Sequence, residues 1–222
     1  MLSRSLTLLP RALLGTVTLA ALSRHKQILA AEQPPDTSLG SLWAQAMDGM
    51  CDVPGCDAIS SPEGVMYLTP AAEAPAPVEW PRCIAKSVIY SLTAWNPNGK
   101  AASDAFNQAA SKRLARDIAA ERLRPRAMWR SFGFSVGEGW REEGFSLAYD
   151  SAERFYGKKN VQKLAEQYKQ AAYYAYHCKD GVLYREVVWC DPARQEANKE
   201  PAVPMELVHT VPTSQLAGRG AL

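Results

Sequence analysis

Cysteines, histidines and closely spaced carboxylates are the residues of this sequence whose types and spacing could support chemistry. Cys51 and Cys56 flank a Pro-Gly pair with four residues between them, so both thiols could meet a metal ion or each other. No second pair of closely spaced cysteines follows, and the chain holds 5 cysteines and 3 histidines in all. The spacing leaves three interpretations open, which are a weak zinc site, a disulfide and free thiols.

Acid–base and nucleophilic catalysis find weaker support. Glu138, Glu142 and Glu143 could supply paired carboxylates, but their surroundings favour a solvated loop. His177 and Cys178 are adjacent on an expected strand, where neighbouring side chains point to opposite faces and cannot pair directly. Signatures of phosphate loops, dinucleotide-binding folds, zinc proteases and serine hydrolases are absent. We therefore predict no catalytic residue and no cofactor. The sequence favours a protein that is not an enzyme but does not decide the question.

The charges are distributed unevenly along the 222 residues, which are 47% hydrophobic and typical of a globular protein in composition. The formal net charge of +2 comes from the first 31 residues, which hold four bases and no acid. Residues 32–85 contain one base and eight acids, whereas residues 86–191 contain 17 bases and 12 acids. An acidic segment thus precedes a basic one, and the overall charge gives little support to nucleic-acid binding.

Residues 1–31 have the composition of an organellar import presequence, because they are rich in Leu, Ala, Ser, Thr and Arg and lack Asp and Glu. Arg4 and Arg11 are seven residues apart and share one face of a helix, whose other side leucines can form. A mitochondrial transit peptide is the favoured interpretation. A secretory or plastid signal and an uncleaved, membrane-associated segment stay open.

Residues 32–85 form an acidic, proline-rich arm, since eight of the 15 prolines lie between positions 34 and 81. This composition favours extended chain with little packing. Residues 41–47 could form a short helix with Trp43 and Met47 on one face. Two interpretations of that face stay open: a docking element for a partner, or a cover for the protein's own core.

Residues 86–191 carry the patterns of regular secondary structure. Strands are expected at 86–95, 127–136, 144–149, 171–178 and 182–190, the last two joined by a hairpin turn at 179–181. A helix is expected to begin after Ser103, which suits an N-cap, and to end before Pro125. Its apolar stripe would be Phe106, Ala110, Leu114 and Ile118, and that of a second helix Val161, Leu164, Ala165 and Tyr168.

The resulting order, β-α-β-β-α-β-β, predicts an α+β fold in which one antiparallel or mixed sheet carries two helices on one face. In this prediction residues 86–191 form a two-layer sandwich. The leader 1–31 and the extended arm 32–85 precede it, and an extended tail follows at 192–222.

The order of several short motifs resembles the domain-of-unknown-function family numbered 3293. The shared features are Thr93-Ala94-Trp95-Asn96-Pro97 with Gly99, then Asn107, then Glu143-Gly144-Phe145, and finally Tyr168-Lys169-Gln170-Ala171-Ala172. The likeness spans roughly residues 88–178 and rests on the order and spacing of the motifs rather than on any single one. It implies a compact α+β domain and no known activity.

Four polar residues belong to that pattern and are the candidates for a ligand site: Asn96, Asn107, Glu143 and Gln170. Together at the ends of the strands they could bind a small polar ligand. The alternative is a structural role, in which Asn96 caps a turn and Gln170 satisfies backbone groups at a helix end.

Arginines are concentrated on the first expected helix and the strand after it. The candidate partner surface consists of Trp43, Met47, Arg113, Arg116, Arg124, Arg126 and Arg130. Such a surface suits an acidic protein or an anionic lipid better than RNA. The alternative is a solvated helix face whose charges are neutralised by Asp117, Glu121 and the acidic arm.

These observations predict a non-catalytic accessory or assembly subunit of a mitochondrial complex at the inner membrane, of the respiratory or ATP-synthase type, acting through protein–protein contacts. The leader, the missing catalytic signatures and an arm and tail long enough to wrap around partners motivate this hypothesis. Two alternatives stay open. One is a small-molecule-binding enzyme of unknown reaction that uses Asn96, Glu143 and Gln170, and the other is a factor associated with the mitochondrial ribosome or RNA.

Overall fold

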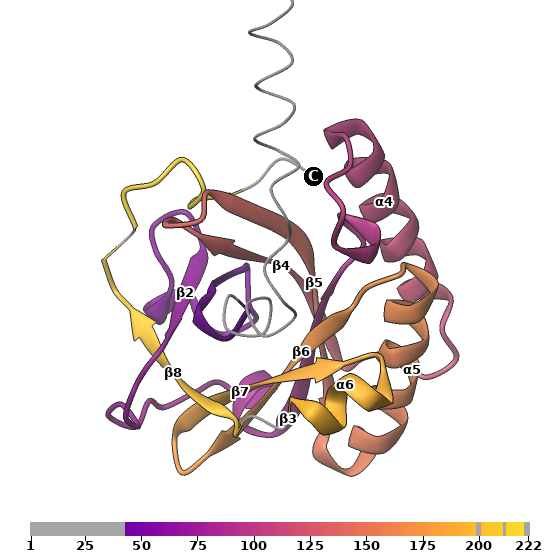
Figure 1. The fold of residues 1–222 in the computed structure, drawn as a ribbon. Helices are drawn as coiled ribbons and strands as arrows, with labels where there is room; N and C mark the ends of the chain where they lie inside the picture. The colour runs from indigo at the N-terminus through magenta and orange to yellow at the C-terminus, as the bar shows by residue number, and fades with distance from the viewer. Residues whose placement is uncertain (1–42, 199–200, 211, 220–222) are drawn as a thin grey trace, which may run out of the picture. The chain divides into compact units, whose positions relative to one another are not determined.

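The structure of the protein is a computed structural model that describes residues 43–198, 201–210 and 212–219. The expected leader at 1–31 lies outside these residues. The strands are β1 Met47–Cys51, β2 Val65–Pro70, β3 Ser87–Thr93, β4 Ala127–Ser135, β5 Trp140–Asp150, β6 Ala172–Lys179, β7 Val182–Trp189 and β8 Val203–Val208. In the described ranges these eight strands form a closed barrel in the order β1-β2-β8-β7-β6-β3-β5-β4 (Figure 1). Every pairing is antiparallel, and β4 pairs with β1 to close the barrel.

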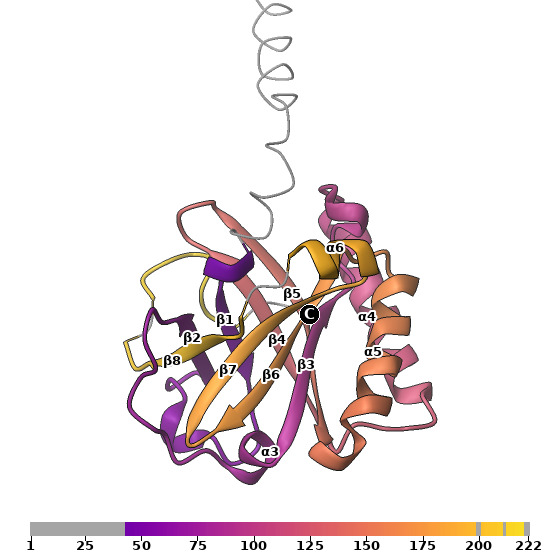
Figure 2. The same cartoon turned by 60° about the horizontal axis from the view of Figure 1, so that its bottom comes forward.

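Two long helices lie side by side against one side of the barrel (Figures 1 and 2). The helices are α3 Arg82–Ala85, α4 Asp104–Ala120, α5 Arg154–Gln167 and α6 Pro192–Ala197. Ser103 Oγ accepts the backbone N–H of Phe106 at 3.3 Å, which confirms Ser103 as the N-cap of α4. Among the described helices, none combines the length and the apolar character that a membrane crossing requires.

The predicted two-layer sandwich is wrong, although the order β-α-β-β-α-β-β is found as β3-α4-β4-β5-α5-β6-β7. The sheet does not stay open, because the expected arm supplies β1 and β2 and the expected tail supplies β8. These three strands are short and lie among prolines, so their local sequence resembles extended linker. Their pairing partners are far away in the chain, as in the register between Gly49 and Phe132, and no local pattern reveals such contacts.

The interior of the barrel is filled by apolar side chains. Because side chains alternate along a strand, every second residue points inward. All eight strands in the described ranges contribute to this interior core: Met50, Met66, Leu68, Ile89, Trp129, Ala148, Tyr176, Leu183, Met205 and Leu207. Trp80 and Ile84, next to and within α3, and Val53 and Cys56, which follow β1, also belong to it.

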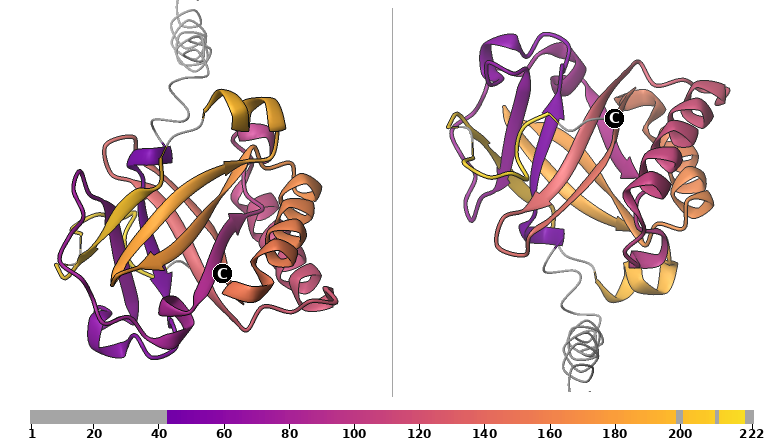
Figure 3. Two further views of the ribbon diagram at one scale, coloured as in Figure 1. Left: turned by 90° about the horizontal axis from the view of Figure 1, so that it is seen from below. Right: turned by 90° about the horizontal axis from the view of Figure 1, so that it is seen from above.

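Two apolar patches on the outside of the barrel have separate covers. The first, on β3, β5 and β6, includes Leu92, Leu147 and Tyr173 and is covered by α4 and α5. The second includes Tyr67, Phe132 and Phe134, and residues of the C-terminal segment (212–219) pack against it. Figure 3 shows α4 and α5 on one side of the barrel and β8 with the yellow segment that follows it on the other.

The apolar stripe expected for α4 is present with one exception. Ala110, Leu114 and Ile118 are buried under the helix, whereas Phe106 is 46% exposed. Four residues advance a helix by slightly more than one turn, so a stripe at this spacing drifts around the axis. Phe106, at its start, therefore lies outside the contact with the sheet.

Glycine 49 allows β1 to close the barrel against β4. A Cβ atom at Gly49 would lie 2.1 Å from Cζ of Phe132, so the ring occupies the space where a side chain would be. Gly49→Ala should therefore destabilise the protein by roughly 1–3 kcal/mol through overpacking. Urea unfolding, monitored by circular dichroism, measures the change in the free energy of unfolding.

The matched control for that substitution is Gly137→Ala, in the turn between β4 and β5. A Cβ atom at Gly137 meets nothing within 4 Å. This variant should stay within about 0.5 kcal/mol of the wild type. Equal stability of the two variants would contradict the role assigned to Gly49.

Candidate functional site

The loop between β3 and α4 is organised around Asn96, whose backbone is left-handed with a φ of 49°. Asparagine tolerates this conformation because its short side chain forms hydrogen bonds locally. Asn96 Oδ1 accepts hydrogen bonds from Ala102 N at 3.0 Å and from Asn107 Nδ2 at 3.2 Å. In return Asn107 Oδ1 accepts the backbone N–H of Asn96 at 3.1 Å. The two asparagines thus hold the loop against the first turn of α4.

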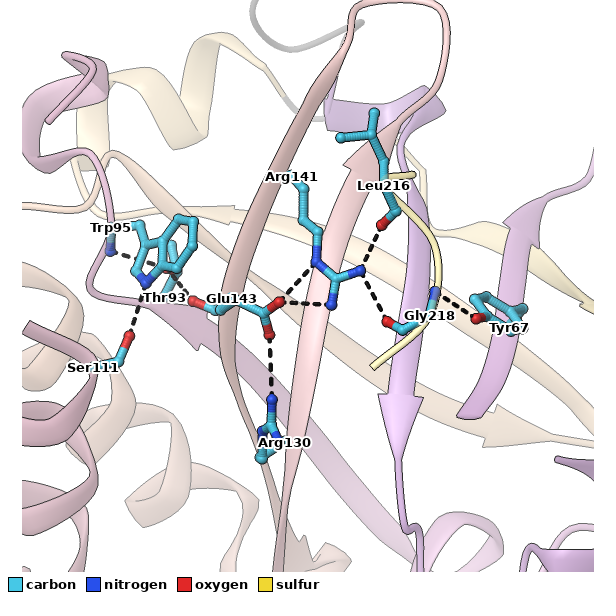
Figure 4. Close-up of polar contacts among 9 residues, drawn as sticks. All are labelled: Tyr67, Thr93, Trp95, Ser111, Arg130, Arg141, Glu143, Leu216 and Gly218. Carbon is cyan, nitrogen blue, oxygen red and sulfur yellow. Dashed lines mark hydrogen bonds and ion pairs between the residues drawn. The ribbon is translucent and has the colours of Figure 1, made fainter. Parts of the chain in front are cut away.

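Gln170 fastens the same loop from the junction between α5 and β6. Its Nε2 donates to Trp95 O at 2.8 Å. The Trp95 indole in turn donates to Ser111 Oγ on α4 at 2.8 Å (Figure 4). The structure therefore brings Asn96, Asn107 and Gln170 together around one loop, where their polar atoms bind the chain itself.

Glu142, rather than the sequence candidate Glu143, is the carboxylate that joins this network. Asn96 Nδ2 donates to Glu142 Oε1 at 2.8 Å. Glu142 and Glu143 are neighbours on β5 and not members of a solvated loop, so their side chains lie on opposite faces of the sheet. Glu142 shares its face with Ala148, which belongs to the interior core.

Burial changes the chemistry of Glu142. Removal from water raises the pKa of its carboxyl above the usual glutamate value, and the hydrogen bond from Asn96 offsets part of that effect. A carboxyl with a raised pKa can act as a proton donor or acceptor. In the structure the partner of Glu142 is the side-chain amide of Asn96, which closes the β3–α4 loop. The role of Glu142 seen here is therefore structural.

Glu143 lies on the outer face of β5 between two arginines (Figure 4). Arg141 approaches Glu143 Oε1 with Nη2 at 2.6 Å and Nε at 2.7 Å, and Arg130 Nη2 lies 3.9 Å from Oε2. The side chains of Glu143 and Arg141 are only 4% and 13% exposed, so solvent screens this ion pair weakly. We call Glu143, Arg141 and Arg130 the Glu143 cluster.

Arg141 also binds the C-terminal segment. Its Nη1 donates to Leu216 O at 2.5 Å and to Gly218 O at 2.9 Å, and Gly218 N donates to Tyr67 Oη at 2.8 Å (Figure 4). The guanidinium lies over the ring of Phe132, 3.5 Å from its centroid. One arginine therefore connects a carboxylate of β5, a ring of β4 and two carbonyl groups that are distant in sequence.

A second buried ion pair joins Asp48 of β1 to Arg185 of β7, with Arg185 Nη1 at 2.5 Å from Asp48 Oδ2. The guanidinium also donates to the carbonyl oxygens of Trp43, Ala44 and Ala46 at 3.1, 2.7 and 2.8 Å. Burial lowers the pKa of Arg185, but the attraction of Asp48, Tyr174 and Tyr176 and the hydrogen bond to Asp48 together outweigh burial, so the net shift is upward. The pair fixes residues 43–46 at one end of the barrel.

Neither Asp48 nor Arg185 was among the residues predicted from the sequence to form a site. One feature of the sequence could have revealed the pair. Arg185 occupies an inward position of the apolar strand expected at 182–190, and a charge buried there requires a partner. A cavity of about 20 Å³ lies beside Arg185 and is lined also by Trp189 and Asn198. This volume suits one water molecule.

The arginines of the candidate partner surface lie in different local surroundings. Arg113 and Arg116 are exposed on α4, and Arg124 is exposed in the loop that follows this helix. Arg126 forms an ion pair at 2.5 Å with Asp150, the last residue of β5. Arg130 belongs to the Glu143 cluster. The last two therefore lie in separate ionic contacts within the chain.

Trp43 and Met47, the remaining members of that candidate surface, contact the protein's own barrel. The Trp43 ring stacks on Trp189 with centroids 5.7 Å apart. Met47 packs against the outer patch that contains Phe132 and Phe134. These contacts are those of a cover for the protein's own core, which is one of the two interpretations left open by the sequence.

Cys51 and Cys56 are free thiols in different hydrophobic clusters, Cys51 on the outer patch and Cys56 in the interior core. Burial raises the pKa of both thiols, that of Cys56 to about 12. A metal ion binds the thiolate, which a raised pKa disfavours. Within the described residues, no group of three or more potential metal ligands is assembled.

Comparison with known proteins connects this region to one family. Residues 92–173 match a family described as a protein of unknown function (DUF3293), which confirms the resemblance seen in the motifs. The match begins at the end of β3, includes α4, β4, β5 and α5, and ends in β6, so it contains the whole β3–α4 loop network. Searches of curated proteins and of solved structures found no match.

Glu142→Gln should change how stability depends on pH. Because the pKa of Glu142 is higher in the folded protein, the wild type loses stability as pH rises from the ordinary glutamate range through that raised pKa. The variant lacks this loss, which amounts to about 1.4 kcal/mol for each unit of pKa shift. Urea unfolding at a series of acid to neutral pH values measures it, with the exposed Glu138→Gln as control. Parallel curves for Glu142→Gln and the wild type would rule out this linkage.

Arg141→Ala should detach the C-terminal segment while the barrel stays folded. Glu143 would keep its buried charge without its nearest partner, at a cost of roughly 3 kcal/mol. Native-state hydrogen exchange should show faster exchange at Gly218 and unchanged protection in β6. Arg113→Ala, an exposed arginine on α4, is the control. Unchanged protection of Gly218 in Arg141→Ala would show that the segment is held by other contacts.

Proposed function

We propose that this protein is a non-catalytic accessory or assembly subunit of a mitochondrial inner-membrane complex, of the respiratory or ATP-synthase type. It acts through contacts with partner subunits. Two features of the described residues support a structural protein over an enzyme. The ligand candidates Asn96, Asn107 and Gln170 are used to hold a loop, and the barrel interior is filled by side chains. The import-type composition of residues 1–31 supports the location.

The observation that carries the proposal is the outer face of α4. Phe106 is 46% exposed there, and the guanidinium of Arg113 lies over its ring at 5.9 Å from the centroid. Arg116 is exposed three residues further on, hence on a neighbouring part of the same helix surface. We call these three residues the α4 surface. Aromatic and arginine side chains are enriched among the residues that dominate protein–protein binding.

The charge of the α4 surface indicates the partner's chemistry. Two arginines on the same helix surface as an exposed aromatic ring suit an acidic patch on another subunit, which would pair with the guanidinium groups and cover the ring. The opposite face of α4 carries Leu114 and Ile118, which are buried against the barrel. The helix can therefore bind a partner with its outer face without leaving its own core.

The double substitution Arg113→Glu with Arg116→Glu should release the protein from its complex. We would express full-length protein in cells, solubilise the organelles in mild detergent, and separate complexes by native size with mass spectrometry of each fraction. The wild type should co-migrate with one respiratory or ATP-synthase complex. The variant should shift to the free fraction, with co-migration reduced by about tenfold, since reversed charges repel an acidic partner.

The control variant carries Lys86→Glu and Lys179→Glu, two exposed lysines away from α4 that make the same change in net charge. It should migrate as the wild type does. A wild-type protein found only as a free monomer would overturn the proposal. Co-migration with mitochondrial ribosomes would assign the protein to the RNA-associated class instead.

A further inference from the structure

We propose that the start of α5, together with the loop from α4 to β4, is a docking surface for a bilayer that contains anionic phospholipids. The surface consists of Phe155, Tyr156, Lys158, Lys159, Arg122 and Arg124, and we call it the α5 surface. It is separate from the α4 surface, and this inference does not depend on the function proposed above.

The two aromatic residues of the α5 surface are strongly exposed. Phe155 is 70% and Tyr156 is 63% exposed, more than any other large hydrophobic side chain noted in the described residues. Burial of one such side chain typically contributes about 1.5–3 kcal/mol. Burial of both rings against a partner would therefore contribute a substantial free energy of binding.

The backbone of α5 holds these rings outward. Gly157 is buried, and a Cβ atom there would lie 2.6 Å from Cγ of Tyr149, so the helix sits directly on that ring. Tyr90 Oη also donates to Arg154 O at 3.0 Å. Because the helix is fastened on its inner side, Phe155 and Tyr156 cannot rotate into the core and remain presented to the outside.

Bases surround the rings. The α4–β4 loop lies against α5, since Asn160 Nδ2 donates to Leu123 O at 3.3 Å and Lys163 forms an ion pair with Glu121 at 2.9 Å. In Figure 2 this loop and the start of α5 lie at the same end of the molecule. Residues 121–126 and 150–163 together hold seven bases and three acids, a net charge of +4.

This combination of groups matches the surface of an anionic bilayer. Aromatic side chains settle at the level of the lipid headgroups, and each base close to anionic lipid contributes about 1 kcal/mol. Phe155 and Lys159 are four residues apart and share one side of the helix, so insertion of the ring brings the ammonium group to the headgroups. A protein bound in this way lies on the membrane without crossing it.

The geometry of the rings favours lipid over single-stranded nucleic acid. Phe155 and Tyr156 meet edge to face, with centroids 5.6 Å apart and an interplanar angle of 81°. The edge of one ring therefore covers part of one face of the other, which leaves fewer open faces for stacking. Nucleic-acid bases bind to proteins by stacking on open aromatic faces.

Co-sedimentation with vesicles tests the proposal on the full-length protein. We would compare vesicles of phosphatidylcholine alone with vesicles of phosphatidylcholine and phosphatidylserine in equal amounts. The wild type should bind the anionic vesicles more tightly, and Phe155→Ser with Tyr156→Ser should reduce that binding by about tenfold. Val136→Ser, an exposed hydrophobic residue in the turn between β4 and β5, is the matched control and should bind as the wild type does. All variants retain residues 1–31, so binding by that segment contributes equally to each.

Hydrogen exchange locates the contact. Anionic vesicles should slow exchange of the amides in residues 154–159 of the wild type, and this protection should be absent in the double variant. Equal binding by the wild type and the double variant, or unchanged exchange at 154–159, would overturn the proposal. Competition by single-stranded RNA that requires the same two aromatic residues would assign the surface to nucleic acid and also overturn it.

Discussion

The pairing of β1 with β4 is the constraint on which the rest of the structure depends, because it turns an eight-stranded sheet into a barrel in the described part of the chain. An open sheet would leave two edges with unpaired N–H and C=O groups. Gly49 makes the pairing possible, since the ring of Phe132 occupies the space beside it. Once the barrel is closed, inward side chains form one core, and the outward apolar patches need their own covers.

In the closed barrel, the alternation of side chains along each strand decides whether a polar residue points inward or outward. Glu142 points inward, loses water, and closes the β3–α4 loop through Asn96. Glu143, the next residue, points outward to Arg141, which binds the C-terminal segment. Two identical carboxylic acids thus have different tasks because they are separated by one step along β5. Both tasks hold distant parts of the chain together.

The two long helices pack on the barrel with their inner faces, and both proposals concern their outer faces. Their inner faces cover β3, β5 and β6, and Gly157 lets α5 lie directly on Tyr149. Their outer faces carry exposed aromatic residues beside bases, Phe106 on α4 and Phe155 with Tyr156 on α5. Taken together, the two proposals describe a rigid barrel that binds an acidic partner through α4 and an anionic bilayer through the start of α5.

The family match covers residues 92–173, which include the loop network and both long helices but little of β6 and none of β1, β2, β7 or β8. The motifs visible in the sequence therefore belong to the part of the fold that positions Asn96, Asn107 and Gln170. The strands that complete the barrel come from segments outside the match. A resemblance limited to those motifs could therefore imply the helices and the loop. It carried no information on how the barrel closes.

The sequence by itself determined the elements that depend on neighbouring residues. Ser103 caps α4, Leu114 and Ile118 lie on its buried face, and the turn at Asp180-Gly181 joins β6 to β7 with positive φ at both residues. These features follow from local hydrogen bonds and from the periods of helix and strand. Only the tertiary structure decided that β1, β2 and β8 close the sheet, that Arg185 pairs with Asp48, and that Arg141 binds residues 216–218. Such contacts join positions far apart in the chain, and their free energy exists only when the whole barrel has formed.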